Sequence, residues 1–397
     1  MMRGKGISKV ARLLGLVIVW FVAAVPLAAA QQQPSSEPVL RVEAGMHTAT
    51  IYHGAIDSAG RILATASSDK TLRIWSVATG ALIRIVRVPL GDGNEGKLYA
   101  VAISPDGKRI VTGGWTGYQW EQKGSLYVVE VESGRIVNRV GGWPSTVTNL
   151  AWSSDGRFVA AAVAGNGIHV YRASDWQELS SDTDYGDDPS GIAFDRNGRL
   201  ATSSADGFVR LYDQQFQRTA KVKATGGSNP FSVAFSPDGT RLAVGFVDKV
   251  AVDVLAVPSL KRLFAADVPK ATRGNLCCVG WAADGTLLAG GGYEDGHGCP
   301  VLRWSKGGQG KWQSLPASND TVMSLVGLND GGFVYITGDP TFGRYDAQGI
   351  RQLQQGLPIA YYRDQARLVT VLGHPPTRLT MRPLSTSTTY SEPFCSL

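Results

Sequence analysis

Short apolar runs alternate with tight polar turns along most of this chain. The clearest example is Ser104-Pro105-Asp106-Gly107, with the strand-like run 100–104 before it and the run 109–112 after it. Pro presets φ at an early turn position, Asp bonds its own backbone, and Gly accepts the positive φ that reverses the chain. The pattern therefore predicts an antiparallel hairpin at this point.

Versions of the same turn recur through the sequence. The turn glycines are residues 60, 107, 156, 198, 239, 285 and 331, at spacings of 47, 49, 42, 41, 46 and 46. A strand–turn–strand unit repeated every ~40–50 residues is typical of a β-propeller. We predict an all-β fold of about seven four-stranded blades, with repeats at 46–90, 91–140, 141–184, 185–224, 225–268, 269–316 and 317–356.

The first thirty residues have a different pattern. Four basic residues precede the apolar run 13–25, and the small residues 28–30 fit a signal-peptidase site before Gln31. We predict that 1–30 is a signal peptide and that the protein is exported to a bacterial periplasm. The alternative is an N-terminal membrane anchor, because 13–30 approaches the ~20 residues that span a bilayer.

The remaining segments complete the predicted domain organisation. Residues 31–38 form a polar linker and 39–356 the propeller. The lone strand 39–42 and the strand 350–353 compete to be the outermost strand of the last blade, which decides whether the two ends of the chain close the ring. Residues 357–397, rich in Pro, Ser and Thr towards the end, predict an irregular tail, truncated or frameshifted.

Net charge narrows the choice of partners. The chain has 39 basic and 33 acidic residues, but four of the basic ones lie in 1–30, which leaves 35 against 33. Because the exported part is nearly neutral and has no block of Lys and Arg, nucleic acid is a poor partner. We expect a monomer that has no membrane contact beyond the export signal.

Four cysteines are present: Cys277, Cys278, Cys299 and Cys395. In an oxidising compartment Cys277 or Cys278 could pair with Cys299, since both segments lie in one repeat and would be adjacent strands or loops. The alternative is three small buried thiols. No Cys-x-x-Cys or Cys/His spacing indicates structural zinc.

The first repeat contains Gly45-Met46-His47, Ser67-Ser68-Asp69 and Ile74-Trp75-Ser76. This order resembles the WD-repeat family, in which a His, Ser, Asp and Trp form a hydrogen-bonded tetrad that holds a blade rigid. The resemblance implies a structural tetrad of His47, Ser67, Asp69 and Trp75. Met46 and Ser76 depart from the pattern. It also implies a likeness to exported bacterial WD-repeat chains that continue into a second propeller or a caspase-like domain.

Two inserts lengthen the loops of the propeller. The loop 113–124 contains Trp115, Tyr118 and Trp120, and Trp143 lies in the next repeat. Exposed Trp and Tyr are enriched at binding hot spots, so these four residues are the candidate binding surface, and packing between blades is the alternative. The second insert, 290–300, carries Tyr293, His297 and Cys299.

Little in the sequence indicates catalysis. There is no Gly-x-Ser-x-Gly, only five His, and no carboxylate repeated at one register except in the hairpin turns. The acidic segment 182–188 could hold Ca²⁺ but lacks the distant bidentate Glu. We predict a scaffold, not an enzyme, that needs no cofactor or metal and binds a protein or peptide on one propeller face. The alternative is a metal-dependent propeller hydrolase of lactonase type.

Overall fold

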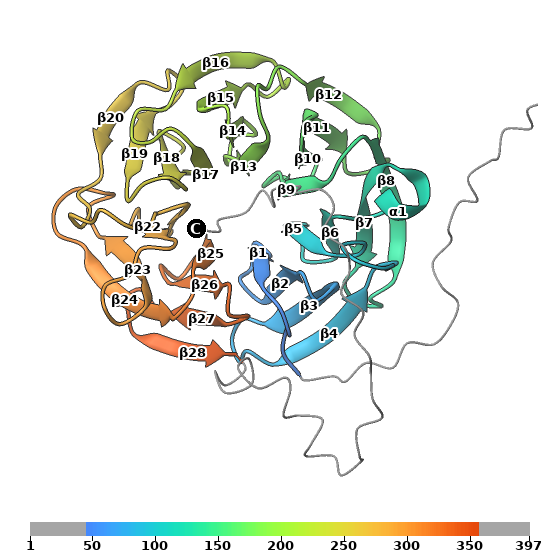
Figure 1. The fold of residues 1–397 in the computed structure, drawn as a ribbon, viewed down its shortest axis with the longest axis horizontal. Coiled ribbons are helices and arrows are strands. Elements are labelled where there is room, and N and C mark those ends of the chain that lie inside the picture. Colours follow the sequence, from blue (N-terminus) through green and yellow to red (C-terminus); the bar gives the residue numbers. More distant parts are fainter. Residues whose placement is uncertain (1–44, 357–397) are drawn as a thin grey trace, which may run out of the picture. The chain divides into compact units, whose positions relative to one another are not determined.

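The structure, a computed structural model, describes residues 45–356. They form seven four-stranded antiparallel sheets arranged as the blades of a propeller around a central axis. Figure 1 shows the first strand of each blade nearest the centre and the fourth at the rim. The predicted fold class is confirmed.

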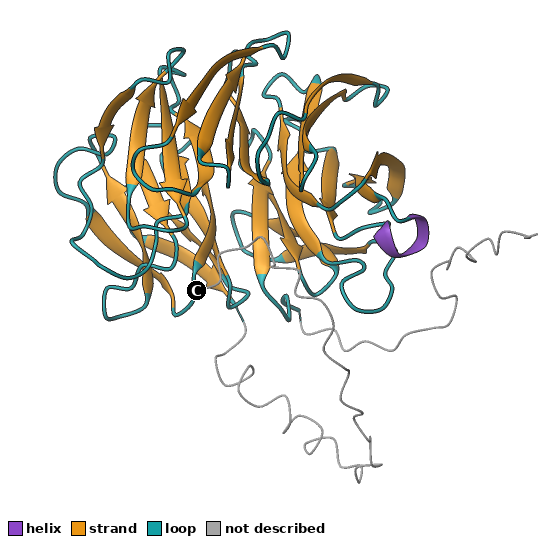
Figure 2. Ribbon diagram, turned by 45° about the horizontal axis from the view of Figure 1, so that its top comes forward, coloured by secondary structure: helices purple, strands orange, loops and turns teal. Residues whose placement is uncertain are grey.

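Each blade is one uninterrupted stretch of chain. The first contains β1 (Ile51–Ile56), β2 (Ile62–Ser67), β3 (Thr71–Ser76) and β4 (Leu82–Arg87), and the second β5 (Leu98–Ile103), β6 (Arg109–Gly114), β7 (Gly124–Glu130) and β8 (Ile136–Trp143). The third contains β9 (Val147–Trp152), β10 (Phe158–Val163), β11 (Gly167–Arg172) and β12 (Glu178–Asp182), and the fourth β13 (Pro189–Phe194), β14 (Leu200–Ser204), β15 (Phe208–Tyr212) and β16 (Arg218–Lys223). The fifth contains β17 (Pro230–Phe235), β18 (Arg241–Phe246), β19 (Val252–Ala256) and β20 (Arg262–Ala265), and the sixth β21 (Cys278–Trp281), β22 (Leu287–Gly290), β23 (Cys299–Trp304) and β24 (Gln313–Ser318). The seventh contains β25 (Val322–Gly327), β26 (Phe333–Thr337), β27 (Phe342–Tyr345) and β28 (Arg351–Gln355). Figure 2 shows one short helix among the described residues, α1 (Tyr118–Glu121), at the edge of the ring.

The outer strand of the last blade comes from the C-terminal side of the propeller. β28 pairs with β27 and completes the seventh sheet. The strand predicted at 39–42 lies outside the described residues, as do the predicted signal peptide, the linker and the tail. Of the two strands that competed for the outer position, 350–353 therefore takes it.

The repeated turns owe their shape to local hydrogen bonds. In the second blade Ser104 Oγ donates to Asp106 Oδ1 at 2.6 Å, and the same carboxylate oxygen accepts the Lys108 amide at 3.0 Å. Gly107 follows at a φ of 74°, which a side chain would oppose. This geometry explains why the turn was recognisable from the sequence alone.

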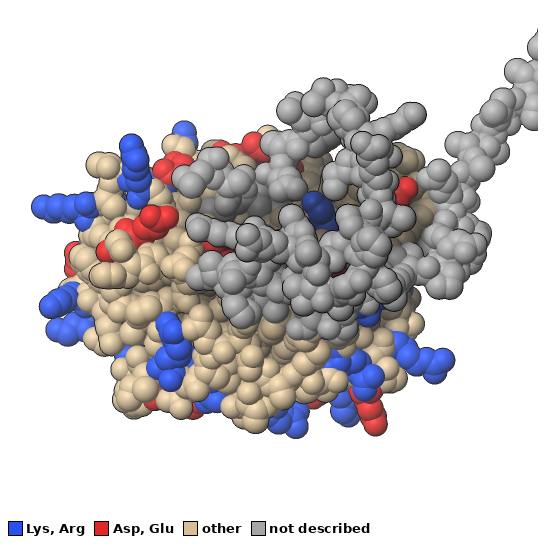
Figure 3. Space-filling view, turned by 60° about the horizontal axis from the view of Figure 1, so that its bottom comes forward, with Lys and Arg blue, Asp and Glu red and all other residues tan. Residues whose placement is uncertain are grey.

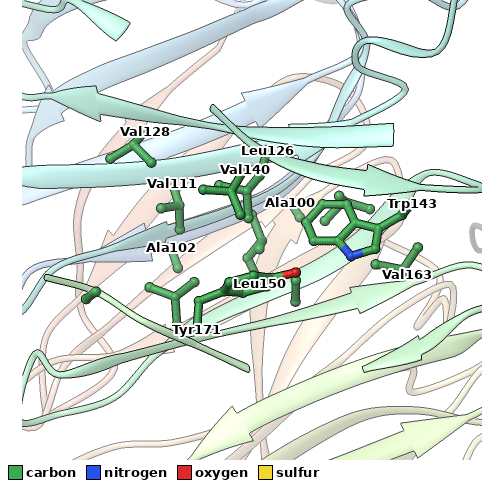
Figure 4. Close-up of a cluster of buried hydrophobic side chains, with 14 residues drawn as sticks. Ala100, Ala102, Val111, Leu126, Val128, Val140, Trp143, Leu150, Val163 and Tyr171 are labelled. Atoms are coloured by element: carbon green, nitrogen blue, oxygen red, sulfur yellow. The ribbon is translucent and has the colours of Figure 1, made fainter. Parts of the chain in front are cut away.

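Apolar side chains fill the spaces between neighbouring blades. Figure 4 shows one such cluster, in which Leu126 and Val140 of the second blade meet Leu150 and Tyr171 of the third. Trp143 belongs to this cluster and is only 4% exposed. Its ring centroid lies 6.0 Å from that of Tyr171. Trp143 is therefore a packing residue, and its prediction as part of a binding surface is wrong.

The turn between the third and fourth strands differs from blade to blade. Four blades place a glycine there with positive φ: Gly80, Gly134, Gly307 and Gly349. In the third, fourth and fifth blades the positive-φ residue is Trp176, Phe216 and Leu260, respectively. A bulky residue in this conformation is strained. Phe216 offsets the strain by burial, since it is 7% exposed and packs edge-to-face on Phe158 of the preceding blade at 5.0 Å.

Within residues 45–356, no helix is both long and apolar enough to cross a membrane.

Candidate functional site

The first blade contains a buried chain of four hydrogen-bonded side chains. Trp75 Nε1 donates to Thr65 Oγ1 at 2.8 Å. The same hydroxyl lies 2.7 Å from His47 Nε2, and His47 Nδ1 lies 2.8 Å from Asp69 Oδ2. Burial acts to raise the pKa of Asp69, but His47, Thr71 and the Thr48 amide outweigh it and hold that pKa at about 2. The arrangement ties β2 and β3 to the turn between them and to the segment before β1, which is a structural role.

The hydroxyl in this chain belongs to Thr65, so the prediction of Ser67 as its member is corrected. Ser67 Oγ instead donates to the Ala49 carbonyl at 2.9 Å and accepts the Asp69 amide at 3.1 Å. Ser67 therefore shapes the turn after β2. Thr65 and Ser67 lie two residues apart on one strand, and the sequence motif alone did not distinguish them.

The fourth blade builds a related network from different residues. Tyr185 OH lies 2.7 Å from Thr202 Oγ1 and 2.9 Å from Tyr212 OH. The buried Arg210 guanidinium stacks 3.8 Å from the Tyr185 ring centroid and pairs with Asp206 at 2.5 Å. Tyr185 and Tyr212 thus occupy the places that His47 and Trp75 fill in the first blade. A hydrogen-bonded chain of this kind is therefore present in the fourth blade too, in altered form.

The aromatic loop between β6 and β7 contains the other three predicted binding residues. Trp115, Tyr118 and Trp120 are each half-buried, so part of each side chain reaches solvent. The rings of Trp115 and Tyr118 contact each other with centroids 5.2 Å apart. The structure thus brings Trp115 and Tyr118 together and leaves Trp143 in the core between blades.

This loop is held by polar contacts at both ends of α1. The buried Glu95 carboxylate accepts the Gly117 amide at 2.5 Å and the Gln119 amide at 2.9 Å. Burial raises the pKa of Glu95, and these two hydrogen bonds act against that increase. On the other side, Arg139 donates to both oxygens of Glu121 at 2.6 and 3.0 Å. Sequence analysis missed Glu95 and Arg139, because each lies 18 to 24 residues from its partner.

The cysteines do not form the predicted disulfide. Cys299 is a free, buried thiol. Cys277 directly precedes β21, Cys299 begins β23, and β22 lies between these strands. Because neighbouring strands are ~4.8 Å apart, two cysteines separated by a strand exceed the Cα separation of a disulfide. Cys278 Sγ donates to the Met323 carbonyl at 2.9 Å.

Two of the four aspartates in the acidic segment 182–188 pair with neighbouring cations. Asp182 pairs with Arg218 at 3.1 Å, and Asp184 pairs with Arg218 at 2.8 Å and Lys221 at 3.2 Å. Lys221 and Arg218 lower the pKa of Asp184. Among residues 45–356 no three His, Cys, Asp or Glu side chains are placed to hold a metal ion.

The centre of the ring contains a cavity of about 290 Å³. Its described lining includes His53, Asn149, Ser232 and Ser324 but no Asp, Glu, Lys or Arg. His53 Nδ1 lies 3.2 Å from the Val101 carbonyl. Burial lowers the pKa of His53 to about 4, so the described wall of the channel is uncharged at neutral pH.

Charged side chains are spread over the visible surface. In Figure 3, Lys and Arg project singly with Asp and Glu between them.

The fold and the tetrad together define a β-propeller with a hydrogen-bonded first blade. The family model described as WD domain, G-beta repeat matches residues 43–76, 87–118, 134–172 and 180–213. The chain thus contains four WD repeats, and they lie in the first four blades of a seven-bladed propeller.

Curated relatives belong to the same broad family. Over 247 residues the chain is 23% identical to Pre-mRNA-processing factor 19 homolog 2 of Arabidopsis thaliana, covering 59% of this chain and 43% of that protein. Over 175 residues it is 28% identical to an uncharacterized WD repeat-containing protein of Synechocystis sp., covering 44% and 48%. Over 187 residues it is 25% identical to human Transducin beta-like protein 2, covering 44% and 40%. The matches span less than half the length of each of these relatives.

Proposed function

We propose that the protein is a non-catalytic scaffold that binds a protein or peptide partner through the aromatic loop on its second blade. WD-repeat propeller relatives support a scaffold of this kind. The observation that carries the proposal is the loop itself: Trp115, Tyr118 and Trp120 are partly exposed on a segment fixed by Glu95 and Arg139. Aromatic anchors held in place before binding lose little conformational entropy when a partner arrives.

The test compares the affinity of selected peptides for the native protein with their affinity for a variant of the aromatic loop. A phage-displayed random peptide library is selected on the protein, and the selected peptides are measured against W115S/Y118S/W120S. We expect affinity to fall at least about tenfold, because hot-spot aromatic residues contribute about 2 kcal/mol or more when truncated. The matched control is I83S/L179S/L263S, which removes three exposed apolar side chains of the outer strands.

Two outcomes decide the proposal. Loss of binding in the loop variant and retention in the control support it, provided that both variants unfold at the same temperature as the native protein. Peptides that bind the loop variant as tightly as the native protein refute it.

The cellular location is part of the proposal. We propose export to the periplasm with cleavage after Ala30, on the basis of the basic head and apolar run in 1–30. Intact mass of the protein recovered from a periplasmic extract tests this: a chain that begins at Gln31 supports export with cleavage, and a full-length chain in the membrane fraction supports the anchor instead.

A further inference from the structure

A groove of about 670 Å³ lies between the second and third blades, beside the turns that follow β5, β9 and β11. The aromatic loop follows β6, so the groove and the loop lie at opposite ends of the strands. The groove is therefore a second surface, separate from the one in the proposed function.

The apolar part of the groove is provided by Trp152 and Phe158. Trp152 is half-buried, and its indole Nε1 donates to the Gly156 carbonyl at 3.1 Å. Its ring packs edge-to-face on Trp176 at a centroid distance of 6.0 Å. Because the polar edge of Trp152 is already satisfied, what it offers to the groove is aromatic surface.

The charges at the groove are unbalanced in favour of cations. Asp155 pairs with Arg157 at 2.6 Å, and Arg172 pairs with Asp175 at 2.7 Å. Asp106 turns back to bond Ser104 and the Lys108 amide.

Two cations of the groove, the Lys108 ammonium and the Arg109 guanidinium, are left out of these ion pairs. Both side chains are exposed, and neither forms an ion pair or side-chain hydrogen bond with any described residue. These two cations line the groove beside Trp152, and the nearby Asp106 carboxylate attracts both of them without forming a direct ion pair with either.

The position equivalent to this groove, between the fifth and sixth blades, is closed by side chains. Trp281 ends β21 as Trp152 ends β9, and Arg241 begins β18 as Arg109 begins β6. There the Arg241 guanidinium stacks 5.2 Å from the Trp281 ring centroid, and Trp281 is 8% exposed. Arg109 makes no such stack on Trp152 among the described contacts, so the groove between blades two and three stays open.

We propose that this groove binds an acidic peptide segment of a partner protein, with one apolar side chain against Trp152 and carboxylates paired with Lys108 and Arg109. Arg pairs with carboxylates in bidentate geometry, and Trp and Arg are the residues most often found at binding hot spots. A neutral or basic segment would leave both cations without a direct ion pair.

The test uses two displayed peptide libraries on the full-length protein. Both fix one apolar position; one is rich in Asp and Glu around it, and the other is rich in Asn and Gln. We expect binders from the acidic library. Their affinity for K108E/R109E should be at least about tenfold lower, because the two new carboxylates repel the carboxylates of the peptide that the native cations attract. Binding should also weaken as salt is raised from ~50 to ~500 mM.

The matched control is R196E/K306E. It makes the same change in net charge with two exposed cations on turns at the same end of the strands, in the fourth and sixth blades. Retention of binding in this control assigns the loss in K108E/R109E to the groove and not to total charge. W152A is a second variant, measured together with its unfolding temperature.

The inference is overturned if the acidic library yields no more binders than the amide library, or if its binders are unaffected by K108E/R109E. Binders that depend on Trp115, Tyr118 and Trp120 but not on the groove would support the proposed function while overturning this inference. The two failures are therefore distinguishable.

Discussion

Replacement of Thr65 by Val tests which hydroxyl holds the first blade. Val has nearly the shape of Thr, so the change removes a hydroxyl without opening a cavity. Thr65, His47 and Trp75 are each at most 1% exposed, so water cannot replace the lost partner. A buried polar group left unsatisfied costs about 1–3 kcal/mol, and two such groups lose their partner here. We therefore expect T65V to lower the free energy of unfolding by about 2–6 kcal/mol.

The comparison that sharpens this experiment is S67A. Ser67 Oγ contacts the Ala49 carbonyl and the Asp69 amide, both only partly buried. Its removal should cost about 1–2 kcal/mol, since each of the two hydrogen bonds has an ordinary net value of about 1 kcal/mol. Urea unfolding followed by far-UV circular dichroism gives both values.

A double-mutant cycle then isolates the Trp75–Thr65 contact. W75F removes the indole Nε1 and its hydrogen bond, so T65V in a W75F background should cost less than T65V alone. A cost for T65V no larger than that for S67A, or strict additivity with W75F, would refute the assignment of Thr65.

Three further predictions follow from buried groups and strand pairing. The pKa of Asp69 is lowered from 3.8 to about 2 in the folded state. The contribution of this carboxylate to the free energy of unfolding is therefore complete above pH ~4 and is lost as the pH falls towards ~2. The stability difference between the native protein and D69N should shrink over that interval, which urea midpoints measured at a series of acid pH values would show. F216A should be more destabilising than F216G, because both lose the contact with Phe158 but only Gly relieves the positive φ, by about 1 kcal/mol; the reverse order in urea unfolding would contradict this reasoning. A chain ending at 350 should unfold at a lower temperature than one ending at 356, because only the shorter chain lacks β28 and exposes the edge of β27; equal unfolding temperatures would show that β28 adds nothing.

The arrangement of the blades was predictable because the turn chemistry is local. Asp106 and Gly107 determine their turn through contacts within five residues, and the same pattern marks each later blade. The predicted boundary at 140 falls inside β8, which continues to Trp143, and that at 316 falls inside β24. Strand ends depend on pairing partners, so the sequence located them less closely than the turns.

The candidate site was less predictable because burial is set by the neighbouring blade. Trp143 and Trp115 have similar surroundings in sequence, yet only Trp143 meets the third blade and becomes buried. Thr65 could have been recognised from its place ten residues before Trp75, a spacing repeated by Thr202 and Tyr212. Lys108 and Arg109 look like ordinary turn residues until the open groove is compared with its closed equivalent at Trp281.

Because every blade is continuous in sequence, the protein has no obligatory starting point. The contact between the first and last blades is made by ordinary packing and by bonds such as Asn329 Nδ2 to the Ser58 carbonyl at 2.6 Å. A circular permutant opened in the connection between β16 and β17, with the original ends joined by a flexible linker, would keep the same seven sheets and the same neighbours. The ring is thus defined by the cyclic order of its blades. New termini could be placed so that a fused domain is attached at the end of the strands that does not bind a partner.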